Sequence, residues 1–165
     1  RLGRSLGVFA VEAAGCGGCA CEVAALAGPH YDFERFGLRF VASPRHADVL
    51  LVAGALGRNM REALERALAA MPEPRWVVAV GDCAADGGPF RGSYAVEGGV
   101  AGALPVDLLI PGGPPAPAQI LEGLLALLAA QQGRRKGGPA DGGEGDGAAG
   151  KKKGRSDMSA GPWPP

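Results

Sequence analysis

The chain has 165 residues, 47% of them hydrophobic, which is enough for one hydrophobic core and too little for two. Its 17 basic and 17 acidic residues give a net charge of zero. Seven of the basic and four of the acidic residues lie from Gly133 onward, so the part before Gly133 has ten basic and thirteen acidic residues. A mildly acidic body argues against nucleic acid as a partner, and no apolar run reaches the roughly 18 residues of a membrane span. We therefore expect one domain, residues 1–132, and a tail, residues 133–165.

Five apolar segments, bounded mainly by glycine, proline or serine, predict β-strands. In chain order they are Leu6–Ala13, Leu38–Ala42, Ala47–Ala53, Trp76–Val80 and Val106–Ile110. Trp76–Val80 is a continuous apolar run and Val106–Ile110 is apolar except for Asp107, a pattern typical of strands that are covered on both faces. The sequence therefore predicts an α/β fold, a flavodoxin-like three-layer sandwich around a parallel sheet.

Three segments predict helices. The first is short and stops at a Gly-Pro pair, the second is amphipathic with Asn59 as its N-cap, and the third is apolar nearly all round. The third is either a core helix or one that docks on a partner. The ranges are Glu22–Ala27, Met60–Met71 and about Pro117 to Gln131.

Two segments exceed what such a fold needs. The glycine-rich stretch Asp86–Ala103 is longer than a connection between strands requires, so we expect it, with the apolar last helix, to contact a partner. Beyond Gly133 a mixture of glycine, proline and charge cannot bury a core. We predict that this tail is disordered.

Three cysteines follow two of the predicted strands. Cys16 and Cys19 come after the first strand and Cys83 comes after the fourth, while a Pro-Gly-Gly-Pro-Pro loop around Gly113 follows the fifth. The carboxyl ends of parallel strands meet at one edge of a sheet, where sites in such folds form. Thiolates hold iron–sulfur clusters, and glycines let the backbone approach them closely. A Cys-x-x-Cys among four cysteines also suits a reducing compartment better than a disulfide framework.

These motifs resemble the small-subunit family shared by membrane-bound [NiFe] hydrogenases, formate hydrogenlyase and the B subunit of respiratory complex I. The resemblance covers residues 5–130, and in complex I the two cysteines of the first motif are adjacent. Here two residues separate them, which implies the hydrogenase branch. The matching segments are Cys16-Gly17-Gly18-Cys19-Ala20-Cys21-Glu22, Ser43-Pro44-Arg45-His46-Ala47-Asp48, Gly81-Asp82-Cys83-Ala84, Pro105-Val106-Asp107 and Pro111-Gly112-Gly113-Pro114-Pro115.

The resemblance implies an electron-transfer subunit of a hydrogenase-like or NADH-quinone-oxidoreductase-like complex. A [4Fe–4S] cluster would pass electrons to or from a large catalytic subunit, and this chain would carry no catalytic residue. The complex would be cytoplasmic and peripheral on the inner face of the cell membrane, with membrane-arm subunits as indirect neighbours. The resemblance also implies that Arg45 and His46 lie near the cluster against the large subunit; an ordinary loop is the alternative.

Position by position, Cys16, Cys19 and Cys83 match three of the four family ligands of the cluster, and the fourth position reads Gly113. The departure leaves Cys21, a carboxylate such as Asp82 or Asp86, or water as the fourth ligand. In a regular helix Cys21 would point about 200° away from the cysteine two residues earlier, so we predict a labile site with a non-cysteine fourth ligand. Cys21 would otherwise be a small buried hydrophobe.

Other functions remain open at this point. A chain that lost its ligand set could be a cluster-less interaction protein with the same fold. The Cys-x-x-Cys could be part of a structural zinc site or a pair of unreactive thiols in the core. It could also be the dithiol of a thioredoxin-like oxidoreductase, because it lies between a strand and a helix, where thiol pKa values fall. That last interpretation leaves Cys83 unused.

Overall fold

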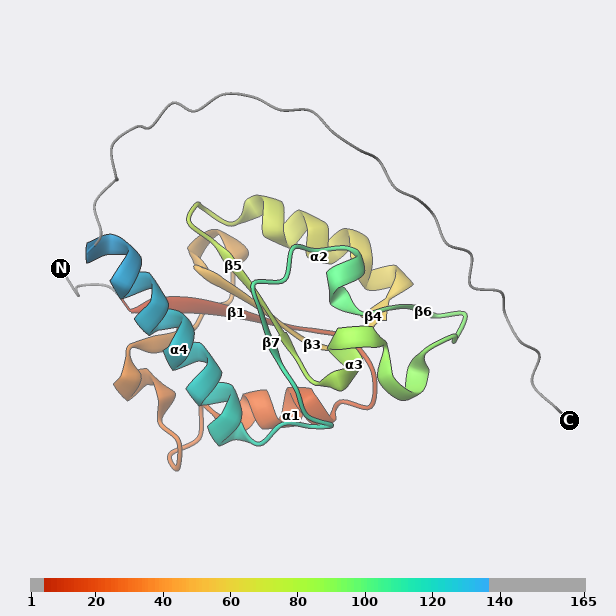
Figure 1. Ribbon diagram of the computed structural model, residues 1–165, viewed down its shortest axis with the longest axis horizontal. Coiled ribbons are helices and arrows are strands. Elements are labelled where there is room, and N and C mark those ends of the chain that lie inside the picture. Colours follow the sequence, from red (N-terminus) through yellow and green to blue (C-terminus); the bar gives the residue numbers. More distant parts are fainter. Residues whose placement is uncertain (1–4, 137–165) are drawn as a thin grey trace, which may run out of the picture.

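The computed structural model describes residues 5–136. Of the predicted tail, residues 133–136 are helical, which corrects the predicted start of the tail, and the rest lies outside the described residues. All five predicted strands form and lie parallel in one sheet, in the order β2-β1-β3-β5-β7 (Figure 1). Counting only these five strands, the order is 2-1-3-4-5, which is the flavodoxin-like order. The strands are β1 (Leu6–Ala14), β2 (Leu38–Phe40), β3 (Val49–Gly54), β5 (Trp76–Val80) and β7 (Leu108–Ile110).

Helices cover both faces of this sheet. Figure 1 shows α1 (Gly18–Ala25) and α4 (Pro117–Lys136) on one face and α2 (Arg58–Ala70) on the other. All six residues of β3 are buried, and the first five alternate between the two hydrophobic cores: Leu51 packs on the α1 and α4 side, and Leu50 packs on the α2 side. The predicted three-layer α/β sandwich is confirmed.

The helix boundaries differ from the prediction, and glycines set the starts of the first two helices. Helix α1 begins at Gly18, four residues before the predicted Glu22, because Gly17 takes a left-handed conformation (φ 78°) at the N-cap. Helix α2 begins at Arg58 with Gly57 at its N-cap, so the prediction of Asn59 as N-cap is wrong. Helix α4 extends through Lys136 rather than ending near Gln131.

The last helix is a core helix. Ile120 and Leu124 are fully buried, and the other leucines before Ala130 are half-buried against the same core. At Gly123 the helix lies so close to β7 that an added Cβ would come 2.8 Å from Ile110. Packing within this chain therefore accounts for the buried side of α4.

The glycine-rich stretch is folded onto the body. It contains the end of α3 (Asp82–Asp86), two 3₁₀ turns (Gly88–Phe90 and Val100–Gly102) and β6 (Val96–Gly98), which pairs antiparallel with β4 (Leu56–Gly57). Val100 is fully buried. A Cβ at Gly99 would lie 1.9 Å from the Ala85 carbonyl oxygen, so only glycine lets the stretch cross α3. Two further 3₁₀ turns, Phe33–Phe36 and Pro44–His46, precede β2 and β3.

Candidate functional site

Loops from three strands meet at the carboxyl edge of the sheet. Cys16 lies in the loop after β1, Cys19 lies in the first turn of α1, and Cys83 lies in α3, directly after β5. The loop after β7 joins them, because the Gly81 amide donates to Ile110 and a Cβ at Gly18 would lie 3.6 Å from Pro114. The structure thus brings the three cysteines and the proline loop together from distant parts of the sequence.

The three thiols are close enough to act on one another. Burial raises the pKa of Cys19 above 9.0, and the charges of Cys83, Cys16 and Asp82 raise it further. Burial likewise raises the pKa of Cys83, followed by the charges of Cys16, Asp82 and Asp86. Such a cluster of like charges disfavours the thiolate forms, whereas bound metal cations would favour them.

A glycine faces each of the three sulfurs. A Cβ added at Gly81 would lie 2.6 Å from Cys19 Sγ, and one added at Gly88 would lie 2.9 Å from Cys83 Sγ. A Cβ added at Gly18 would lie 3.5 Å from Cys16 Sγ. Gly81 and Gly88 also have φ values of +94° and +51°, which residues other than glycine rarely adopt. The backbone can therefore approach the thiols closely, which favours binding of an iron–sulfur cluster.

Gly113 lies at the same site, and a carboxylate lies beside it. A Cβ at Gly113 would have one neighbour among the described residues within 4 Å, Asp82 Oδ2, at 3.5 Å. The Gly112 amide donates to Asp82 Oδ1 at 2.9 Å, and the Asp82 amide donates to the Gly112 carbonyl at 2.8 Å. The loops after β5 and β7 are thus joined at two points next to the position without a cysteine.

Cys21 lies apart from the other three thiols. Helix α1 is regular through this residue, whose amide donates to the Gly17 carbonyl at 3.0 Å. Cys19 is buried and Cys21 is exposed, as expected for residues two positions apart on a helix. The alternative that Cys21 is a buried hydrophobe is wrong. The charge of Cys21 is also absent from those that act on Cys19 and Cys83.

Arg45 and His46 lie at the opposite edge of the sheet. They form a 3₁₀ turn before the amino end of β3, and both are exposed. Because the strands are parallel, this end is a full strand length from the edge where the cysteines lie. The expectation that these two residues lie near the cluster is therefore wrong.

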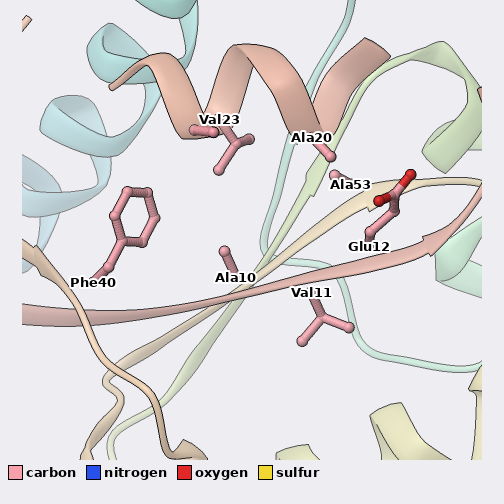
Figure 2. Close-up of a pocket in the computed structure, with 8 residues that line it drawn as sticks. Ala10, Val11, Glu12, Ala20, Val23, Phe40 and Ala53 are labelled. Carbon is pink, nitrogen blue, oxygen red and sulfur yellow. The ribbon is translucent and has the colours of Figure 1, made fainter. Parts of the chain in front are cut away.

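Glu12 is a residue of this region that the sequence analysis did not single out. It lies on β1, and its Oε1 would be 3.5 Å from a Cβ at Gly17, in the cysteine loop. Figure 2 shows Glu12 and Ala10 of β1 pointing towards Ala20 and Val23 of α1, across a cavity of about 280 Å³. A lone carboxylate near the end of an apolar strand was the sequence signal that could have identified it.

The donor set fits three corners of a cubane cluster. Among residues 5–136, no group of three or more His, Cys, Asp or Glu side chains forms a ready site for a single metal ion. A cubane instead binds each cysteine sulfur to a different iron, so its ligands are spread more widely. Three thiols on separate elements, each with a glycine against its sulfur, match that requirement, and the fourth corner has no thiol.

Comparison with known proteins identifies relatives of the chain. Residues 16–127 match the model of a family described as NADH ubiquinone oxidoreductase, 20 Kd subunit. Formate hydrogenlyase subunit 7 of Escherichia coli (strain K12) is 44% identical over 128 residues, which cover 78% of this chain and 50% of that protein. The B subunit of NADH-quinone oxidoreductase from Heliobacterium modesticaldum is 45% identical over 119 residues, which cover 72% and 68%. The chain thus spans half the length of the first relative.

Solved structures show the same fold. A chain of the membrane-bound sulfane sulfur reductase, an archaeal respiratory membrane complex, superposes with a TM-score of 0.69 at 29% identity, covering 79% of this chain and 72% of that one. A chain of an NAD+-reducing [NiFe]-hydrogenase superposes with a TM-score of 0.59 at 21% identity, covering 77% of this chain and 93% of that one. In the part of this chain that the structure describes, no helix has the length and apolar character needed to cross a membrane.

Proposed function

Because the chain belongs to the family of the 20 kDa subunit of NADH ubiquinone oxidoreductase, we propose that it is the electron-transfer small subunit of an oxidoreductase complex. In this proposal Cys16, Cys19 and Cys83 hold a [4Fe–4S] cluster. The main support for this proposal is that the three thiols lie close together at one edge of the sheet, each with a glycine beside its sulfur.

When bound, the cluster would accept and release one electron at a time. The chain's own residues would hold it and partly enclose it: of its three proposed ligands, Cys19 is buried, Cys83 is half-buried and Cys16 is exposed. Cys19 lies on the buried side of α1, and Gly81 lets the loop after β5 approach its sulfur closely. The 3₁₀ turn at Gly88–Phe90 lies beside Cys83 and Gly15, which places it against the site. Burial and hydrogen bonds to sulfur would set the reduction potential. The proposal assigns no catalytic residue to this chain.

The partner in this proposal is a large catalytic subunit of the hydrogenase branch. The two-residue spacing between Cys16 and Cys19 supports that branch, while the identities to a formate hydrogenlyase subunit and to an NADH-quinone oxidoreductase subunit are nearly equal. One structural relative belongs to a respiratory membrane complex. We propose the same setting here: a cytoplasmic subunit, peripheral on the inner face of the cell membrane, with membrane-arm subunits as indirect neighbours.

The second candidate function is a cluster-less interaction subunit with the family fold. Gly113 favours it, because the fourth thiolate of the family is missing from an otherwise matching loop.

Anaerobic reconstitution with iron and sulfide separates the two functions. We expect about four irons per chain and a broad brown absorption, the content of a single cubane. Cys16→Ser, Cys19→Ser and Cys83→Ser should each remove most of the iron. Cys21→Ser is the matched control, since this exposed thiol faces away from the others, and it should leave the iron content nearly unchanged.

Other outcomes identify the rivals. Binding of zinc instead of iron would indicate a structural zinc site. A colourless chain that binds neither metal would indicate the cluster-less interaction subunit. A reversible Cys16–Cys19 disulfide in an iron-free chain would support the thioredoxin-like dithiol. Loss of iron from Cys21→Ser as complete as that from Cys83→Ser would make Cys21 the fourth ligand.

A further inference from the structure

Asp82 is the charged residue that the fold places at the position of the missing thiolate. Its Oδ2 lies 3.5 Å from the point where a side chain at Gly113 would begin, in ordinary van der Waals contact. Its charge acts on both Cys19 and Cys83, so the carboxylate lies near these two thiols.

The second oxygen of Asp82 holds the carboxylate in place. Oδ1 accepts a hydrogen bond from the Gly112 amide at 2.9 Å, and the Asp82 amide donates to the Gly112 carbonyl at 2.8 Å. Oδ2 has no hydrogen bond from another described residue. A carboxylate fixed through one oxygen and open at the other is a preorganised monodentate donor.

The other candidate donors are placed less well. Asp86 is engaged elsewhere: its Oδ1 accepts from Gly88 at 2.8 Å and its Oδ2 pairs with Arg91 at 3.8 Å. The charge of Asp86 is also absent from those that act on Cys19. Cys21 is exposed on a regular helix and is absent from both sets of interacting charges.

We propose that the Asp82 carboxylate is the fourth protein ligand of the cluster and replaces the thiolate that Gly113 lacks. This inference rests on the proposed function. Oδ2 donates a lone pair to the one iron without a cysteine and displaces solvent from it, and no electron is transferred in the exchange. A carboxylate carries the same single negative charge as a thiolate, so the total charge of the four ligands is unchanged. Oxygen is the harder donor, so this iron is the one most readily lost.

The test compares ⁵⁷Fe-reconstituted wild type, Asp82→Ala and Asp82→Asn, with Asp86→Asn as a matched carboxylate control. The proposal predicts one iron with a distinct Mössbauer signal in the wild type. In water enriched in ¹⁷O, the reduced wild-type cluster should show no ¹⁷O coupling from solvent, whereas the cluster of Asp82→Ala should show it. Asp86→Asn should behave as the wild type. Asp82→Asn retains an oxygen that can accept from Gly112, so it separates loss of ligation from loss of the loop contact.

Restoring the thiolate completes the test. A Cβ fits at Gly113, so the double variant Gly113→Cys, Asp82→Ala should hold four irons with no solvent coupling. Wild type and Asp82→Ala with the same ¹⁷O coupling would make water the ligand and overturn the inference. Iron uptake by Gly113→Cys but not by the wild type would also overturn it, while leaving the three-cysteine site intact. Absence of iron from every variant would overturn the proposed function as well.

Discussion

Glycines shape the site as much as the cysteines do, and Gly81 is the clearest case. A methyl group there would lie 2.6 Å from Cys19 Sγ, and the residue has φ +94°. Gly81→Ala should therefore displace the thiol and remove most of the bound iron, at a cost of about 1–3 kcal/mol in stability from backbone strain. Iron analysis and urea unfolding would measure the two effects.

Gly92 provides the control. Its φ is +82°, but an added Cβ would meet no described atom within 4 Å. Gly92→Ala should thus have a similar strain cost and retain its iron. If both variants lose iron equally, strain rather than the contact with Cys19 is responsible.

The raised pKa values of Cys19 and Cys83 give the metal-free protein a pH dependence. Their main cause is burial, with the neighbouring thiols and Asp82 adding to it. A folded-state pKa above the unfolded value means that the folded chain binds more protons, so this contribution to stability is present below the unfolded pKa and is lost as pH rises through the folded one. Urea unfolding of the reduced, metal-free chain should show its stability falling above about pH 9.

A Cys19→Ser, Cys83→Ser variant isolates this effect from other groups that titrate in the same range. It should show a smaller fall over the same pH interval. An identical fall in the variant and the parent would show that these thiols do not cause it.

Among the secondary-structure elements, two further aspartates join neighbouring strands through a pair of hydrogen bonds like the pair between Asp82 and Gly112. Val77 donates its amide to Asp107 Oδ2 at 2.8 Å, and the Asp107 amide donates to the Val77 carbonyl at 2.9 Å, at the amino ends of β5 and β7. Asp48 makes the equivalent pair with Gly7, at 2.9 and 2.8 Å, between β3 and β1. Asp48 and Asp107 thus hold neighbouring strands together at the amino edge of the sheet.

Asp107→Ala should lower the free energy of unfolding by about 1–3 kcal/mol, because it leaves the Val77 amide without its charged acceptor. The contact lies at the amino edge of the sheet, so iron content should not change. Chemical unfolding and iron analysis of the same samples would check both statements. Asp107→Asn, which keeps an acceptor oxygen, should recover part of the loss; equal stability of Asp107→Ala and wild type would contradict the structural role.

At the scale of the whole molecule, a bound cluster would tie together the carboxyl edge of the sheet. Its ligands come from the loop after β1, from α1 and from α3, with the loop after β7 joined through Asp82. A group that binds only the folded chain stabilises it, and the effect is greatest in the segments that it orders. Removing the cluster should speed amide hydrogen exchange at residues 15–19, 81–88 and 111–116.

The amino edge provides the internal reference for that measurement. Exchange near Gly7, Asp48 and Asp107 should be little affected, because hydrogen bonds within the chain hold these strand ends without the cluster. Uniform acceleration over the whole sheet would instead show that the cluster stabilises the fold globally.

Local sequence patterns were sufficient to predict the architecture and the edge of the sheet at which the three cysteines lie. The strands are predominantly apolar segments followed by glycine, proline or serine, and such local patterns do not depend on the rest of the fold. Once the sheet is parallel, all strands end at one edge, so Cys16 and Cys83 had to lie near each other although 67 positions separate them. The same argument placed Gly113 at that edge.

The contacts at the fourth position, in contrast, follow from tertiary packing. The conformation of Gly17 starts α1 early enough to place Cys21 on the side of the helix away from Cys19. The hydrogen bond between Gly112 and Asp82 joins residues 30 positions apart and brings Oδ2 beside Gly113. Gly99 lies against Ala85, so the long loop that suggested a partner contact is partly folded into the body. Contacts of this kind leave no pattern among neighbouring residues, because they depend on how two separate segments are oriented once both have packed on the sheet.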